Sequence, residues 1–246
     1  MSTFSIVSRR RFLQLTGLAA SGLVLGAVVP RNVALAGILE QAEGAQLNVF
    51  VSVATDGTVE IIAHRSEMGT GIRTSLPQVV ADEMQADWQR VKVIQAHGDA
   101  RYGSQNTDGS RSVRDFYHIM RQMGAAARTL LEQAAAATWQ VPVEECAARD
   151  HAVHHGSGKS LGFGELAARA AELPLPDLET LRLKDAADFR YIGKDVPIVD
   201  LQDMITGNAI YGIDVHVPGM LYASIERTPW LQGRIASYDS SAALAV

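Results

Sequence analysis

Residues 67–74 read EMGTGIRT and lie where one periodicity of the chain gives way to another. The preceding residues 59–63, VEIIA, have the composition of a β-strand, and apolar side chains recur at helical spacing over residues 72–84. The junction therefore places two glycines at the start of a helix, where unpaired N–H groups and the helix dipole favour an anion. The stretch is either an ordinary turn or a backbone-lined anion site, and spacing alone favours the turn.

The composition narrows the class of protein. The 246 residues, 47% hydrophobic and 20% charged, suit a globular protein of one or two domains with a buried core. The first 36 residues hold four arginines and no acid, so the remainder has 18 basic and 27 acidic residues and a net charge of −9. That acidity argues against nucleic acid as a partner. The single cysteine, Cys146, excludes an internal disulfide and an iron–sulfur cluster held by this chain alone.

The N-terminus has the parts of an export signal. Paired arginines in S-R-R-x-F-L (residues 8–13) precede a glycine-diluted apolar stretch (residues 15–29), and an A-x-A cleavage pattern follows. We expect a twin-arginine signal peptide over residues 1–36 and delivery to the periplasm. An uncleaved anchor in the inner membrane is the alternative, because residues 12–29 approach the minimum spanning length.

Downstream, the periodicity predicts a mixture of strands and helices. Strands are expected at residues 47–53 and 58–63 around a Thr-Asp-Gly turn, at residues 91–94, in a hairpin within residues 141–158 and at residues 221–227. Helices are expected at residues 72–84, 113–138 and 163–173. Ser112 and Asp115 suggest a capping-box-like start for the long helix.

Two stretches resemble a phosphate-binding motif and a metal site, but neither fits the pattern that such a site requires. Gly-Ser-Gly-Lys-Ser at residues 156–160 resembles the end of a P-loop, but Val153 stands where that motif needs its first glycine, so a hairpin turn is expected. Three histidines lie close together, but their spacing fits no standard metal site and strand alternation divides them between two faces: His151, His154 and His155.

Two sets of short blocks occur in order along the chain. The first comprises EMGTG at residues 67–71, ADE at residues 81–83 and DGSRS at residues 108–112, before a long Ala-rich helix. The second comprises FRYIG at residues 189–193, VD at residues 199–200, TG at residues 206–207, YGID at residues 211–214 and PGML at residues 218–221. Together they resemble the molybdenum-binding subunit of the xanthine dehydrogenase/aldehyde oxidase family, in particular the isoquinoline 1-oxidoreductase beta-subunit type.

The resemblance implies an α+β fold, with a molybdopterin-binding αβ domain at residues 45–185 and an incomplete α/β hammerhead domain at residues 186–246. It implies a molybdenum–molybdopterin cofactor, expected in its cytosine dinucleotide form. The implied cofactor contacts lie on two loops: Met68, Gly69, Thr70, Gly71, Thr107, Asp108, Gly109, Ser110, Arg111 and Ser112. The family usually has glutamine at the place of Thr70, whose shorter hydroxyl reaches less far and could act through water.

The resemblance also implies an activity, namely oxidation of an aldehyde or an N-heterocycle, with electrons passed to a small 2Fe–2S subunit. In that family the general base is a glutamate from a segment far downstream, and Glu67 does not correspond to it. We therefore assign no catalytic or metal-binding side chain, and we expect the chain to be inactive without the missing C-terminal portion of the large subunit. A non-catalytic fragment or assembly partner that needs a second polypeptide is one alternative, and an unrelated exported binding module is another.

Overall fold

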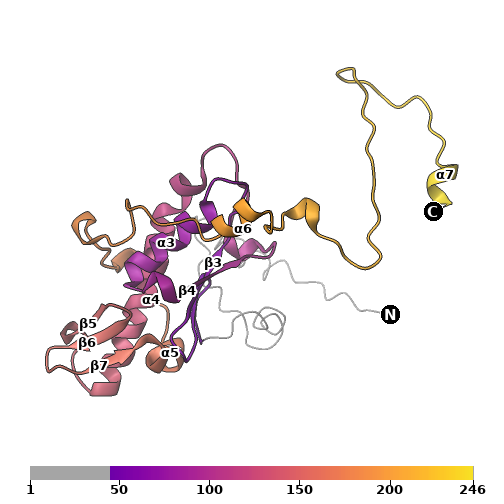
Figure 1. Cartoon of the computed structure of the whole chain (residues 1–246). Helices are drawn as coiled ribbons and strands as arrows, with labels where there is room; N and C mark the ends of the chain where they lie inside the picture. The colour runs from indigo at the N-terminus through magenta and orange to yellow at the C-terminus, as the bar shows by residue number, and fades with distance from the viewer. Residues whose placement is uncertain (1–44, 246) are drawn as a thin grey trace, which may run out of the picture. The chain divides into compact units, whose positions relative to one another are not determined.

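The computed structural model describes residues 45–245. These residues fall into two compact units, the first ending at Gln202 and the second beginning at Asp203. The first unit mixes two small sheets with packed helices, as expected for an α+β fold (Figure 1). The predicted signal peptide, residues 1–36, lies outside the described residues. Among the described residues, no helix is both long and apolar enough to cross a bilayer.

The larger sheet has the strand order β1-β2-β3-β4. Its strands are β1 (Ala45–Asn48), β2 (Val51–Val53), β3 (Val59–Ala63) and β4 (Val91–Gln95). The first three are antiparallel neighbours, whereas β3 and β4 are parallel, with Ile61 opposite Val93. A parallel pair needs a crossover connection, which α3 (Ile72–Met84) supplies. The loops that leave β3 and β4 therefore emerge at the same edge of the sheet.

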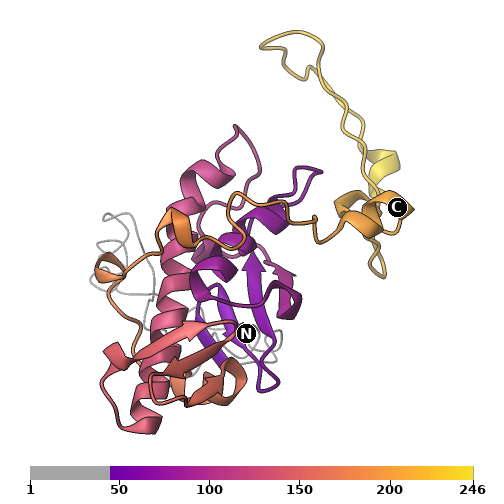
Figure 2. The ribbon, with the colours of Figure 1, turned by 60° about the vertical axis from the view of Figure 1, so that its left-hand side comes forward.

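Helices α3 and α4 (Ser112–Trp139) lie side by side, and both pack against the sheet (Figures 1 and 2). Apolar side chains at helical spacing give α4 one hydrophobic face, and this face is buried: Phe116, Met120, Met123, Ala127, Leu130 and Ala134. The two helices approach closely at Gly124, where an added Cβ would lie 2.5 Å from the carbonyl oxygen of Val80. Glycine at this crossing thus permits contact between the helix backbones.

The smaller sheet consists of β5 (Cys146–Arg149), β6 (Ala152–His155) and β7 (Ser160–Gly162), and α5 (Phe163–Ala171) follows it. The stretch that resembles a P-loop is the hairpin turn between β6 and β7, where the N–H of His155 donates to the carbonyl of Lys159 at 3.0 Å. His151 is buried in the turn before β6, and its Nδ1 accepts from the N–H of Asp87. Burial lowers the pKa of His151, so this residue is a neutral core histidine.

Three secondary-structure predictions were wrong. Residues 47–53 form two strands, because the Asn48 side chain accepts the N–H of Phe50 at 3.0 Å and turns the chain. The long helix has no capping box, because the Ser112 hydroxyl accepts from Arg65 instead of capping the helix. Residues 221–227 form no strand, since no neighbouring strand is present among the described residues of the second unit to complete a ladder.

The Ala-Asp-Glu block on α3 anchors an extended segment of the first unit. Asp82 and Glu83 have no solvent exposure. The Asp82 carboxylate accepts from Lys184 and from three successive backbone N–H groups, those of Arg190, Tyr191 and Ile192. Glu83 pairs with Arg121 at 2.6 Å and Arg128 at 3.4 Å and accepts the N–H of Lys184. These acids therefore fix residues 184–192 against α3.

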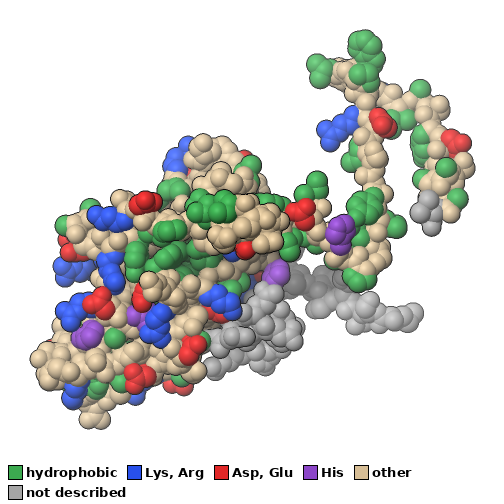
Figure 3. Space-filling view, in the orientation of Figure 1, with side chains coloured by type: hydrophobic (Ala, Val, Ile, Leu, Met, Phe, Trp, Pro, Cys, Tyr) green, Lys and Arg blue, Asp and Glu red, His purple; other side chains and the backbone are tan. Residues whose placement is uncertain are grey.

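The second unit carries the short α7 (Ser241–Leu244), and α6 (Leu201–Thr206) crosses the boundary between the units. Its apolar side chains stand in solvent, as Figure 3 shows, with Leu231 99% and Ile213 91% exposed. The hammerhead assignment for residues 186–246 stays a prediction.

Candidate functional site

The two predicted loops meet at the carboxyl ends of the parallel strands β3 and β4. The Thr107 hydroxyl donates to the carbonyl oxygen of Ser66 at 2.6 Å, and Arg65 Nε donates to the hydroxyl of Ser112 at 3.0 Å. The crevice beyond the carboxyl ends of parallel strands is where open α/β sheets bind ligands. Residues about forty positions apart in sequence are thus brought into contact, with Ser66 beside the first loop and Thr107 at the start of the second.

The first loop, residues 67–71, is closed around its own carboxylate. Oε1 of Glu67 accepts the N–H groups of Met68 at 3.0 Å, Gly69 at 2.7 Å, Thr70 at 2.6 Å and Gly71 at 3.0 Å, and Oε2 accepts that of Arg73 at 3.1 Å. Burial alone would raise the pKa of Glu67, but these N–H groups outweigh it and hold the pKa below its ordinary value. The anion expected at the start of α3 is therefore a side chain of the loop itself.

The second loop turns sharply before α4. Gly109 has φ 55° and Ser110 has φ 54°, so both occupy the left-handed region. A serine there is uncommon, and backbone strain of this kind concentrates at functional sites. Asp108 pairs with Arg111 at 3.0 Å, and both side chains are largely in solvent. Within residues 45–245, no side chain caps the start of α4.

Beneath both loops lies a buried basic pair that the sequence did not reveal. Arg65 is only 2% exposed, lies over the Phe116 ring at 5.2 Å and donates through Nη1 to the Ser104 carbonyl at 2.6 Å. Within the described part of the chain, its Nη2 has no hydrogen-bond partner. Nε and Nη2 share one edge of a guanidinium group, as the two-bond pair of Arg73 with Asp200 illustrates. The unpartnered Nη2 therefore faces the Ser112 side, at the start of α4.

His64 completes this floor. Its ring lies between Phe50, at 5.2 Å, and Phe116, at 4.3 Å between centroids. Burial, and then repulsion from Arg65, lower the pKa of His64 to about 4, so the imidazole is neutral near pH 7. The available sequence signal was the His-Arg pair placed between a buried strand and a glycine loop.

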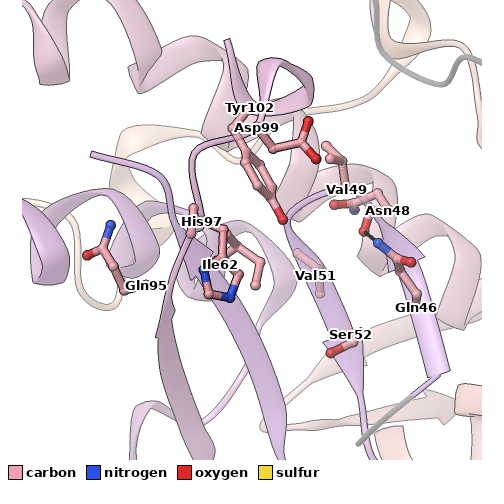
Figure 4. Close-up of a pocket in the computed structure, with 11 residues that line it drawn as sticks. Gln46, Asn48, Val49, Val51, Ser52, Ile62, Gln95, His97, Asp99 and Tyr102 are labelled. Carbon is pink, nitrogen blue, oxygen red and sulfur yellow. Dashed lines mark hydrogen bonds between the residues drawn. The ribbon is translucent and has the colours of Figure 1, made fainter. Parts of the chain in front are cut away.

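A small pocket lies beside the loop that follows β4. It is lined by side chains of β1, β2 and residues 95–102, and Figure 4 shows the Tyr102 ring reaching over the strands that carry Val51 and Asn48. None of the predicted cofactor contacts lines it. Most of those contacts are exposed, with Met68 64% exposed, whereas Gly71 and Ser112 are buried.

Comparison of the sequence with known protein families identifies the family to which the chain belongs. Residues 20–204 match the molybdopterin cofactor-binding domain. The chain belongs to this family. The predicted large subunit of the xanthine dehydrogenase/aldehyde oxidase type is thereby confirmed, as is the α+β fold with a molybdopterin-binding domain.

Three curated relatives match almost the whole of the chain. It is 32% identical over 91% of its length to the beta subunit of isoquinoline 1-oxidoreductase from Brevundimonas diminuta, and covers 34% of that protein. It is 34% identical over 96% of its length to a membrane-bound aldehyde dehydrogenase (pyrroloquinoline-quinone) of Gluconacetobacter polyoxogenes, of which it covers 31%. It is 28% identical over 98% of its length to a nicotinate dehydrogenase subunit of Pseudomonas putida, of which it covers 20%. The chain thus spans about a third or less of these relatives.

Among solved structures, 52% of the chain is similar to 17% of a quinoline 2-oxidoreductase chain from Pseudomonas putida 86, at 20% identity and a TM-score of 0.39.

Proposed function

We propose that this chain forms the loop-bearing part of the large subunit of a molybdenum hydroxylase that oxidises aldehydes or N-heterocycles and passes electrons to a separate 2Fe–2S subunit. One observation carries the proposal: the two loops implied to contact the cofactor meet at the carboxyl ends of β3 and β4. Membership in the molybdopterin cofactor-binding family supports it. Relatives named for isoquinoline, nicotinate and aldehyde support the substrate class.

The residues present fit an anionic cofactor rich in hydrogen-bonding groups. The surface offers exposed groups at Met68, Thr70 and Ser110, the uncapped start of α4, and the partnerless Nη2 of Arg65 beneath it. Unsatisfied donors at a helix start attract phosphate groups, and a buried guanidinium without an acidic partner favours an anion nearby. We infer that Thr107, Asp108, Gly109, Arg111 and Ser112 shape the same surface.

When bound, the molybdenum cofactor would supply the oxygen-transfer and redox chemistry. The chain's own side chains would hold and orient it. Thr70, in place of the family's glutamine, has its N–H taken by Glu67, so only its hydroxyl is free to donate to the cofactor. The cytosine dinucleotide form and a periplasmic location, reached by a twin-arginine signal at residues 1–36, are parts of the same proposal.

The test is the cofactor content of the complete enzyme, purified with its partner subunits. We expect molybdenum by elemental analysis, cytidine monophosphate after acid hydrolysis, iron in the partner, and dye reduction by isoquinoline, nicotinate or an aldehyde. The chain of 246 residues alone should give no dye reduction. A complete enzyme that is active with a dissociable quinone and no molybdenum would refute the proposal. Stable molybdenum without turnover on any of these substrates would favour the assembly-partner alternative.

A further inference from the structure

The Glu67 carboxylate lies where an external anion would bind. Four consecutive N–H groups converge on one of its oxygens, and a fifth reaches the other. Successive N–H groups that point into one concavity form an anion-binding nest, and the start of a helix adds the positive end of its dipole. In this chain the nest and the dipole of α3 are already occupied by a covalently attached carboxylate.

The glycines of the loop serve this closure rather than the close approach of a ligand. Gly69 has φ 95°, yet a Cβ added there would meet no atom of the described residues within 4 Å. Gly71 has φ 77°, and its added Cβ would meet only Ile198, at an ordinary contact distance of 3.5 Å. Glycine is therefore needed for positive φ, which turns the neighbouring N–H groups toward Glu67.

The two helices of the candidate site differ at their starts. The start of α3 is filled by Glu67, whereas α4 begins without a side-chain cap and with the partnerless Nη2 of Arg65 beside Ser112. A phosphate group would meet a negative charge at α3 and a positive charge at α4. The start of α3 therefore repels a phosphate group, whereas the start of α4 attracts one.

We propose that Glu67 is a positioning residue that closes residues 67–71 before the cofactor binds and keeps the cofactor's phosphates away from the start of α3. The closed ring, meaning residues 67–71 with their N–H groups bonded to the Glu67 carboxylate, turns the Met68 and Thr70 side chains outward. These two side chains are the ones that would contact the cofactor. The role toward the cofactor rests on the proposed function, whereas the closed ring does not.

Amide hydrogen exchange on the cofactor-free complete enzyme tests the ring directly. In wild type the amides of residues 68–71 and of Arg73 should be protected although the loop lies at the surface. Glu67→Gln should raise their exchange about tenfold or more, because a neutral amide oxygen accepts more weakly than a carboxylate and the amide NH2 opposes the N–H of Arg73. Glu67→Asp should restore part of the protection. Glu165→Gln is the matched control, since Glu165 accepts the N–H of Gly162 at 2.8 Å before α5, away from the candidate site.

Added inorganic phosphate distinguishes a nest that Glu67 already occupies from an empty one, because phosphate can bind only the empty nest and slow its amide exchange. In Glu67→Ala, which empties the nest, added phosphate should slow exchange of the same amides, while wild type should show no effect. Equal slowing in wild type, or unchanged exchange in Glu67→Gln, would overturn the closed ring. In the loaded enzyme, Glu67→Gln should lower molybdenum content and Glu165→Gln should not; equal molybdenum in both would overturn the positioning role. Absence of molybdenum from wild type would refute the proposed function and leave the exchange results standing.

Discussion

Replacing Asp82 by asparagine removes the central contact that holds residues 184–192 on α3. The side chain is fully buried and accepts from Lys184, whose own side chain is only 5% exposed. It also accepts three backbone N–H groups at 2.8–3.0 Å. Asparagine keeps one oxygen but sets an NH2 group against these donors and leaves the Lys184 ammonium buried without its counter-charge.

Breaking a buried pair in this way costs about 3–5 kcal/mol of the free energy of unfolding. In a chain of this size, that corresponds to a fall in melting temperature of roughly 6–20 °C. Asp200→Asn is the control, because the Asp200–Arg73 pair is partly exposed, at 24% and 20%, and should contribute about 1 kcal/mol or less. Calorimetry on both variants measures the difference.

A second variant isolates the stranded charge. Asp82→Asn combined with Lys184→Met removes the ammonium as well, and should recover about 1 kcal/mol or more relative to Asp82→Asn alone. If Asp82→Asn melts within the range of Asp200→Asn, or if the double variant recovers nothing, the anchoring role of the Ala-Asp-Glu block is refuted.

The pH dependence follows from the same contact. Burial would raise the pKa of Asp82, but the N–H groups of Ile192 and Tyr191 and the Lys184 ammonium hold it below its ordinary value of 3.8. The stabilisation is therefore present above pH 3.8 and is lost as pH falls through the lower folded-state pKa. Asp82→Asn should lack this loss in acid.

Three further outcomes are expected. Gly124→Ala should destabilise by about 1–3 kcal/mol through collision with the α3 backbone, whereas Gly156→Ala, where a Cβ meets nothing within 4 Å, should not; equal melting temperatures would contradict the close crossing. The pKa of His64 falls from 6.5 to about 4 on folding, so the free energy of unfolding of the wild type should decrease by about 1.4 kcal/mol for each pH unit as pH falls from 6.5 to 4. Denaturant unfolding of His64→Leu should not show this decrease, and an unchanged decrease would count against a buried, neutral His64. Arg9→Lys with Arg10→Lys should leave the precursor in the cytoplasm by cell fractionation, and normal periplasmic delivery would argue against the twin-arginine signal.

Periodic segments were the most predictable part of the fold. Apolar spacing placed α3 at its observed bounds and identified the buried face of α4, because both patterns depend only on neighbours three and four residues apart. The Thr-Asp-Gly turn between β2 and β3 was equally local. The break at Asn48 was not, because its side chain also reaches the carbonyl of Met123 on a distant helix, at 3.1 Å.

The candidate site also has some features that the sequence predicts and others that depend on contacts between distant residues. The glycine loops were visible in the sequence, and their meeting follows from the parallel pairing of β3 with β4. The closure around Glu67 depends on positive φ at Gly69 and Gly71, and that conformation emerges only in three dimensions. The role of Arg65 depends on Ser112, 47 residues away, so no local pattern could reveal it.

The central claim is that two loops distant in sequence hold one molybdenum cofactor, and molybdenum content tests it most directly. Gly71, Gly109 and Gly158 all have positive φ, so a valine strains each backbone alike, but Gly158 lies in the β6–β7 turn, outside both loops. In the complete enzyme, elemental analysis should find molybdenum lost from Gly71→Val and from Gly109→Val and retained in Gly158→Val, with circular dichroism showing all three folded. Full molybdenum in either loop variant would contradict the account.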